Sequence, residues 1–153
     1  MVWAADSLHL FTKDLLGRDG RDMAYHFVLP AAPGDYLARL ADSIRLPRRS
    51  VTAAALDVER NTLVLAAYNF RRLLGFLPSS SASLIAFTDF RGTDFFSGRR
   101  YRRNISWAVP SQFEAVDFAG DHRYVYVATE GNPFRPRARV KRLKHPAPQM
   151  KDE

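Results

Sequence analysis

Short apolar stretches, in which hydrophobic and polar positions alternate, run along most of this chain and are separated by turn residues. Alternation with a period of two is typical of β-strands, whereas an amphipathic helix repeats about every 3.6 residues. The pattern predicts strands at 7–12, 23–29, 36–46, 51–56, 62–68, 70–77, 83–90, 99–107, 113–118, 124–129 and 137–143. We therefore expect an all-β, antiparallel protein with very little helix.

Turn and loop signals lie between these strands. Glycine, proline, aspartate and asparagine mark turns at 17–22, 31–35, 57–61 and 119–123, because these residues adopt tight-turn conformations readily. The serine-rich segment 78–82 is expected to be a flexible loop between two strands. Residues 145–153 are expected to form a disordered tail.

One hairpin sequence occurs twice. A-L-D-V-E-R-N-T-L-V-L-A-A-Y at 55–68 is similar to A-V-D-F-A-G-D-H-R-Y-V-Y-V-A-T at 115–129, with Asp57 aligned to Asp117 and Leu65 to Tyr126. Residues 4–14 resemble the same hairpin without its first strand. Self-similarity at such a period indicates a repeat architecture, and four strands per repeat fit the blade of a β-propeller. The expected blades are residues 1–46, 51–109 and 112–144.

Three blades are too few to close a propeller, since propellers usually contain about 4–8. An open arc leaves two exposed hydrophobic edges, which favour association. Three explanations remain open: a fragment of a longer, truncated propeller, a ring completed by self-association through the open blade edges, or a single sandwich or barrel. The start, M-V-W-A-A-D-S-L, is expected to lie inside a strand and shows no signal peptide, which supports the first.

Composition restricts the chemistry more than it suggests a function. The 153 residues have a mass of 17.4 kDa, which corresponds to one ordinary domain. There is no cysteine, so disulfides, thiolate metal sites and a cysteine nucleophile are excluded. No apolar run reaches 18 residues, so no membrane span is expected.

The net charge of +7 is unevenly distributed, because residues 99–144 carry 11 basic and 4 acidic side chains. Aromatic residues lie among the arginines of this segment, namely Tyr101, Trp107 and Phe134, and such a mixture can bind single-stranded nucleic acid. The basic residues at 137, 139 and 141 alternate with alanine and valine, however. That alternation favours the solvated face of an edge strand over nucleic-acid binding.

Several motifs together resemble a known group of proteins. These are D-S-L-H-L-F-T-K-D, H-F-V-L-P-A-A-P-G-D-Y, V-T-A-A-A-L-D, Q-F-E-A-V-D-F, A-T-E-G and above all T-D-F-R-G-T-D-F-F-S-G at 88–98. In this order they resemble the C-terminal part of bacterial β-propeller proteins of the esterase-like or SdiA-regulated-like kind, a mostly uncharacterised family. The resemblance covers residues 4–144. It implies a propeller fold and an extracellular or cell-envelope location, and it assigns no catalytic residue.

Four carboxylates are the candidate ligand-binding residues. Glu114 and Glu130 are two of the four glutamates and lie in the last repeat, while Asp57 and Asp117 occupy matching hairpin positions. If the first strand of each blade lines a central channel, these groups face it and bind a cation, such as Ca²⁺, or a polar ligand. Alternatively, the aspartates only form turns and the glutamates are solvated or paired with arginine.

No catalytic motif accompanies these residues. The sequence contains no G-x-S-x-G, and the four histidines, His9, His26, His122 and His145, lack metal-site spacing. The loop containing Asp89 and Asp94 offers too few carboxylates for a Ca²⁺ site. We therefore expect a non-catalytic binding or scaffold segment without a resident cofactor. The alternatives are a metal-dependent esterase or phosphoesterase using Glu114 and Glu130, and a basic nucleic-acid-binding domain.

Overall fold

Three antiparallel sheets make up the computed structural model, which describes residues 1–12, 22–73, 77–106, 112–131 and 136–148. Sheet A contains β1 (Val2–Ala4), β2 (Ser7–Phe11), β3 (Met23–Pro30) and β4 (Arg39–Arg45). Sheet B contains β5 (Ser50–Asp57), β6 (Thr62–Leu73), β7 (Leu77–Thr88) and β8 (Arg99–Ser106). Sheet C contains β9 (Phe113–Phe118), β10 (Tyr124–Thr129) and β11 (Arg139–Lys144), and one short 3-10 helix, η1 (Phe95–Ser97), precedes β8.

Each sheet is an up-and-down meander whose strand order follows the chain. All pairs of neighbouring strands are antiparallel, and the described residues form no closed barrel. The predicted all-β, antiparallel class is therefore confirmed. No helix in the described segments is long enough and apolar enough to traverse a lipid bilayer.

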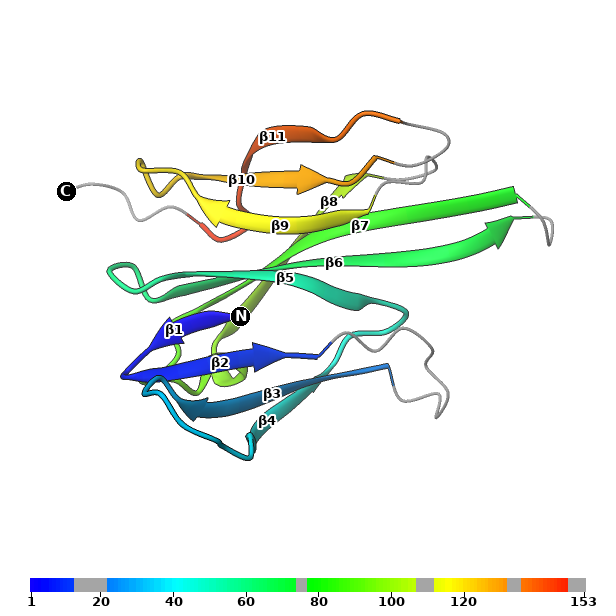
Figure 1. The fold of residues 1–153 in the computed structure, drawn as a ribbon. Helices are drawn as coiled ribbons and strands as arrows, with labels where there is room; N and C mark the ends of the chain where they lie inside the picture. Colours follow the sequence, from blue (N-terminus) through cyan, green and yellow to red (C-terminus); the bar gives the residue numbers. More distant parts are fainter. Residues whose placement is uncertain (13–21, 74–76, 107–111, 132–135, 149–153) are drawn as a thin grey trace.

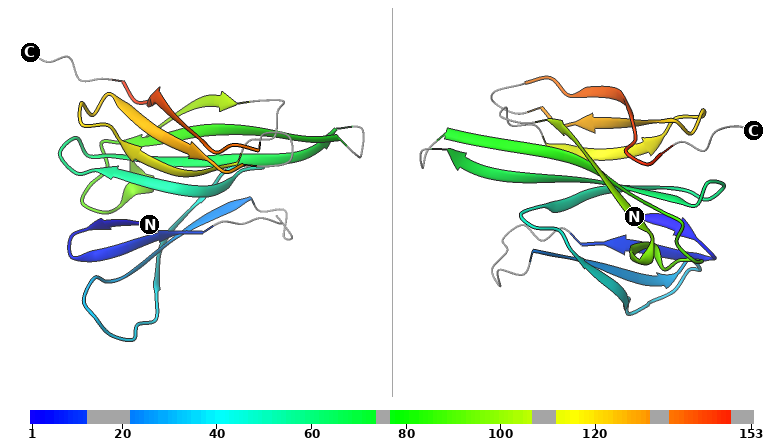
Figure 2. Two further views of the ribbon diagram at one scale, coloured as in Figure 1. Left: turned by 45° about the horizontal axis from the view of Figure 1, so that its top comes forward. Right: turned by 180° about the vertical axis from the view of Figure 1, so that it is seen from behind.

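Sheet B is the middle layer of the molecule, with sheet A on one face and sheet C on the other (Figure 1; Figure 2). Leu63 and Leu65 of β6 pack with Phe87 of β7 in the core shared with sheet A. The alternate positions, Val64 and Ala66, pack in the core shared with sheet C. Because both faces of β6 are covered, consecutive residues 63–68 are all buried, as expected for a strand between two layers.

The serine-rich segment is a strand, and the prediction of a flexible loop at 78–82 was wrong. Strand β7 runs from Leu77 to Thr88 and pairs with β6 in unbroken register from Thr62↔Thr88 to Leu73↔Leu77. Continuous backbone pairing outweighs the weak local preference of serine, because β-propensity depends strongly on context. Beyond their pairing with β5 and β8, the ends of β6 and β7 form a two-stranded arm that projects past the other strands (Figure 1).

Three further expectations need correction. The first hairpin does have a first strand, the three-residue β1. The match of Leu65 to Tyr126 fails, because Leu65 faces the preceding sheet whereas Tyr126 lies on the outer face of sheet C and is 46% exposed. The tail is ordered at its start, since His145 and Ala147 are buried. Residues 149–153 of that tail, and most of the turn predicted at 17–22, lie outside the described residues.

The T-D-F-R-G-T-D-F-F-S-G segment carries η1 and has a clear structural role. Phe95 is 1% exposed and inserts between sheets A and B, where its ring lies 5.1 Å from His9 and from Phe90, centroid to centroid. Gly98 ends η1 so close to the backbone that an added Cβ would lie 2.4 Å from the Thr88 carbonyl oxygen. Through these contacts the segment packs against both sheets and links sheet A to sheet B.

Candidate functional site

The four predicted carboxylates do not gather at one place. Glu114 lies near the start of β9, and the backbone N–H of Glu130 donates to the Gln112 carbonyl 3.1 Å away, so both belong to the same end of sheet C. Asp117 lies three residues after Glu114 on β9, which is about 10 Å further along an extended strand. Asp57 ends β5 in sheet B.

Burial separates these carboxylates further. Glu130 and Asp117 are exposed, and Asp117 Oδ1 accepts a hydrogen bond from the neighbouring N–H of Phe118 at 2.9 Å. Glu114 is half-buried and engaged by another group of the protein. Only Asp57 is buried, with 5% of the residue exposed. It is therefore the one member of the predicted set around which a site is built.

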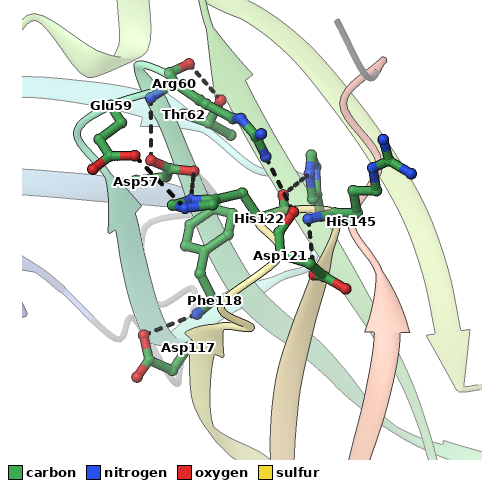
Figure 3. A network of polar contacts seen from close by, with 10 residues as sticks. Asp57, Glu59, Arg60, Thr62, Asp117, Phe118, Asp121, His122 and His145 are labelled. Atoms are coloured by element: carbon green, nitrogen blue, oxygen red, sulfur yellow. Dashed lines mark hydrogen bonds and ion pairs between the residues drawn. The ribbon is translucent and has the colours of Figure 1, made fainter. Parts of the chain in front are cut away.

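Asp57 joins sheet B to sheet C through His122 (Figure 3). Asp57 Oδ2 lies 2.6 Å from Nδ1 of His122, so the imidazole Nδ1–H donates to the buried carboxylate. The other oxygen, Oδ1, accepts the backbone N–H of Arg60 at 3.1 Å and so closes its own hairpin turn. His122 sits in the 119–123 turn with φ 55, where the N–H of His122 donates to the Ala119 carbonyl at 2.8 Å.

More contacts surround His122 and connect three segments. Its Nε2 lies 3.6 Å from Oε2 of Glu59, and its backbone carbonyl accepts Nε2–H of His145 at 3.1 Å. Arg60 Nη1 donates to the Asp121 carbonyl at 3.2 Å, and Arg142 contacts the Asp121 carboxylate. The cluster formed by Asp57, Glu59, Arg60, Asp121, His122, Arg142 and His145 is called the hairpin network below (Figure 3).

The ordered start of the tail belongs to this network. His145 packs edge-on against Phe118, with ring centroids 5.8 Å apart. Burial lowers the pKa of His145, while its hydrogen bond to the His122 carbonyl acts in the opposite direction. The imidazole of His145 therefore serves as a neutral donor that holds the tail against sheet C.

The chemistry of the hairpin network is that of an oriented imidazole. A buried carboxylate fixes His122 through Nδ1, as in the acid–histidine pairs of many hydrolases, but Nε2 faces a second carboxylate, Glu59. Contact of both ring nitrogens with carboxylates favours a structural role for His122, which joins two hairpin turns. Among the described residues, no three histidine, aspartate or glutamate side chains are gathered so that they could hold a metal ion.

A second histidine cluster lies between sheets A and B. His9 of β2 and His26 of β3 are 2% and 1% exposed, and His9 Nδ1 lies 2.7 Å from His26 Nε2. The ring of His26 stacks on Phe11 at 5.0 Å and also lies near Phe95 and Phe96. In the strand predicted at 7–12, His9 alternates with Leu8 and Leu10, and the face that carries His9 is the buried one.

Hydrogen bonding fixes the protonation of this pair. His9 Nε2 lies 3.3 Å from the Ala4 carbonyl and must donate to it, so His9 Nδ1 accepts from Nε2–H of His26. This leaves Nδ1 of His26 as a buried lone pair without a partner among the described residues. Burial lowers the pKa of His9 and, helped by the nearby His9, lowers that of His26 from 6.5 to about 4. Both rings are neutral at pH 7.

Sequence reasoning singled out neither histidine cluster. For His9 and His26 a signal existed, because each alternates with apolar residues in a strand and therefore belongs to one definite face. For His122 there was none, since its contact with Asp57 joins residues 65 positions apart. Comparison of the chain with protein-family models, with curated proteins and with solved structures finds no match.

Proposed function

We propose that the chain is a run of three propeller-type blades and works as a non-catalytic binding and scaffold unit that assembles through its outer sheet faces. The observation that carries this proposal is the outer face of sheet A. An antiparallel sheet with one solvated face normally places polar residues there. In sheet A the positions that alternate with the buried ones are instead mostly large and apolar, namely Trp3, Leu8, Leu10, Tyr25, Phe27 and Leu29.

The stacking inside the chain supports the blade interpretation. The layers follow one another in chain order, and the first strands are neighbours, since β1 contacts β5 and β5 contacts β9. Sheets that radiate from adjacent first strands are the arrangement found in propellers. The uncovered apolar surface thus lies mainly on the sheet faces rather than on the blade edges, where self-association was expected.

The partner that we propose is a second copy of this chain, because the observed packing can continue. Sheet B turns small residues, among them Ala53, Ala55, Ala66 and Ala86, toward larger ones of sheet C, such as Phe113 and Phe118. The outer face of sheet C again carries small residues, Ala115 and Ala128, together with Val140 and Tyr126. Placing this face on the large residues of a second sheet A repeats the small-on-large packing.

Such a contact is head-to-tail, and two copies would form a ring of six sheets, within the usual range of about 4–8 blades. Light scattering coupled to size exclusion should then give twice the chain mass of 17.4 kDa. Trp3→Glu and Tyr126→Glu, one on each face, should each yield monomers. Leu37→Glu is the matched control, because Leu37 is 97% exposed in the loop before β4.

Mixing the two variants tests the geometry. Each Trp3→Glu chain keeps an intact sheet C face and each Tyr126→Glu chain keeps an intact sheet A face, so a mixture should regain dimers joined by one interface. A wild-type monomer at about 100 μM, well above the dissociation constants of specific complexes, would overturn the proposed assembly. A dimer that only Trp3→Glu disrupts would contradict the head-to-tail arrangement.

The extracellular or cell-envelope location implied by the family resemblance remains a prediction.

A further inference from the structure

A pocket of about 350 Å³ lies where the segment that links sheets A and B meets the outer part of sheet B. Its described lining consists of Leu46, Pro47, Arg49, Ile85, Arg100 and Arg102. The volume is within the range of small-molecule sites. Strand β8 ends the order of sheet B and supplies two of the arginines.

The alternation of β8 places two guanidinium groups on one face. Arg100 pairs with Phe87 and Arg102 with Ile85 across the β7–β8 ladder. Both partners belong to the core shared with sheet A, so the two arginines emerge on the side of β8 that faces sheet A. Residues two apart on a strand are about 7 Å apart, a spacing that lets both groups reach one ligand.

The connection between the sheets supplies the third arginine. Leu46 is buried and its N–H donates to the Asp22 carbonyl at 2.8 Å, which fixes the end of sheet A. The N–H of Arg49 donates back to the Leu46 carbonyl at 3.0 Å, and Arg48 takes the turn conformation with φ 56. This tight turn brings half-buried Arg49 to the pocket beside the apolar side chains of Leu46 and Pro47.

The described lining of the pocket is basic and apolar. None of its described lining residues is acidic. On the other side of β8, Arg99 has Asp89 at 4.0 Å and Arg103 donates to the Lys144 carbonyl at 2.8 Å. Arg100 and Arg102 have no comparable partner among the described residues. Arg100 and Arg102 therefore repel each other, and an anion held between them relieves that repulsion.

We propose that this pocket binds a small organic anion, with a phosphate or carboxylate group held by Arg49, Arg100 and Arg102 and an apolar body lying on Leu46, Pro47 and Ile85. Guanidinium groups suit this ligand, because their planar donors bind such oxygens in pairs. The pocket is independent of the proposed assembly through the outer sheet faces, since no residue that we assign to those faces lines it.

Titration calorimetry with phenyl phosphate, benzoate and inorganic phosphate at about 150 mM salt tests the proposal, because attraction between exposed charges more than about 8 Å apart is largely screened at that ionic strength. We expect phenyl phosphate or benzoate to bind more tightly than inorganic phosphate, and the better of the two identifies the head group. The double variant Arg100→Gln/Arg102→Gln should bind about tenfold more weakly or worse. Arg99→Gln/Arg103→Gln removes the same charge from the opposite side of the same strand and should bind as the wild type does.

Two results would overturn the proposal. One is the absence of measurable binding of both aromatic anions to the folded wild-type protein. The other is an equal loss of affinity in both double variants, which would mean that net charge rather than the pocket attracts the anion. If Arg100→Gln/Arg102→Gln does not fold, Ile85→Ala in the apolar floor replaces it. That variant should weaken phenyl phosphate binding and leave inorganic phosphate unaffected.

Discussion

Nδ1 of His9 accepts a hydrogen bond from Nε2 of His26 across 2.7 Å, in a core from which water is excluded. Every ring N–H of the pair has an acceptor only while both rings are neutral, because a proton added at Nδ1 of His26 meets no acceptor among the described residues. Asp42 and Asp94 favour the charged form of His26, whereas Arg39 and His9 oppose it, and burial decides the outcome.

This pair makes the fold sensitive to acid. The folded-state pKa of His26, about 4, lies below the unfolded value of 6.5, so between these pH values the unfolded chain binds more protons. The free energy of unfolding should therefore fall as the pH falls from 6.5 toward 4, by roughly 3 kcal/mol at about 1.4 kcal/mol per pKa unit. Urea unfolding at several pH values measures the change.

His26→Phe should flatten this dependence, because the phenyl ring fits among Phe11, Phe95 and Phe96 and carries no titrating group. If that variant does not fold, His26→Gln removes the titrating ring instead. Equal wild-type stability at pH 7 and pH 4.5 would show that the pair is not the acid-sensitive element.

Asp57 and Asp117 occupy matching positions in the sequence but should contribute differently to the stability of the fold. Asp57→Ala leaves the half-buried His122 Nδ1–H and the Arg60 N–H without their acceptor, which should cost about 2–4 kcal/mol. Asp117→Ala is the control and should stay within about 0.5 kcal/mol, because Asp117 is exposed and its described side-chain hydrogen bond is to the next residue. Chemical denaturation of both variants measures the two losses in the free energy of unfolding. Similar losses would contradict a special role for the hairpin network.

Two glycines give a second matched pair. Gly98→Ala should destabilise by about 1–3 kcal/mol, because the new Cβ would meet the Thr88 carbonyl oxygen at 2.4 Å. Gly120→Ala should be neutral within about 0.5 kcal/mol, since a Cβ there meets nothing within 4 Å. The two melting temperatures measure this difference. A tolerated alanine at position 98 would mean that η1 is looser than described.

The metal-dependent alternative predicts a different response. The four carboxylates Glu114, Glu130, Asp57 and Asp117 are spread over two sheets and two ends, so we expect neither chelator nor added Ca²⁺ or Mg²⁺ to shift the melting temperature. Binding of a cation to the folded state would raise it. A shift that disappears in Glu114→Gln/Glu130→Gln would instead support the hydrolase hypothesis and contradict ours.

Most of the strands could be predicted from the local alternation of hydrophobic and polar residues. Alternation located the strands around Leu8 and Val125, because each of these strands has one definite buried face and hydrophobic periodicity reports it. It failed at Ser80, where the register with β6 overrides composition, and at His145, where burial depends on a contact with His122. These are non-local effects that a window of neighbouring residues does not contain.

The site was less predictable than the fold for the same reason. Asp57 was selected as a turn residue that could also bind a ligand, yet its partner comes from the next sheet. The four arginines of β8 lie within five residues of one another in the sequence, but alternation divides them between two faces, with Arg100 and Arg102 on one and Arg99 and Arg103 on the other. Which of them share a pocket depends on the turn at Arg49.

Because every sheet is built from one continuous stretch of chain, the described strand pairs join residues at most 26 positions apart, as in Thr62↔Thr88, and folding can proceed meander by meander. Loop-closure entropy for such contacts is small, so each meander can form early. Sheet B does not form independently of the other two sheets. The residues of β6 become buried only when sheet A covers one face and sheet C covers the other. Amide exchange should therefore be slowest at Leu63–Ala67, and native-state opening should begin at the outer strands β4 and β11.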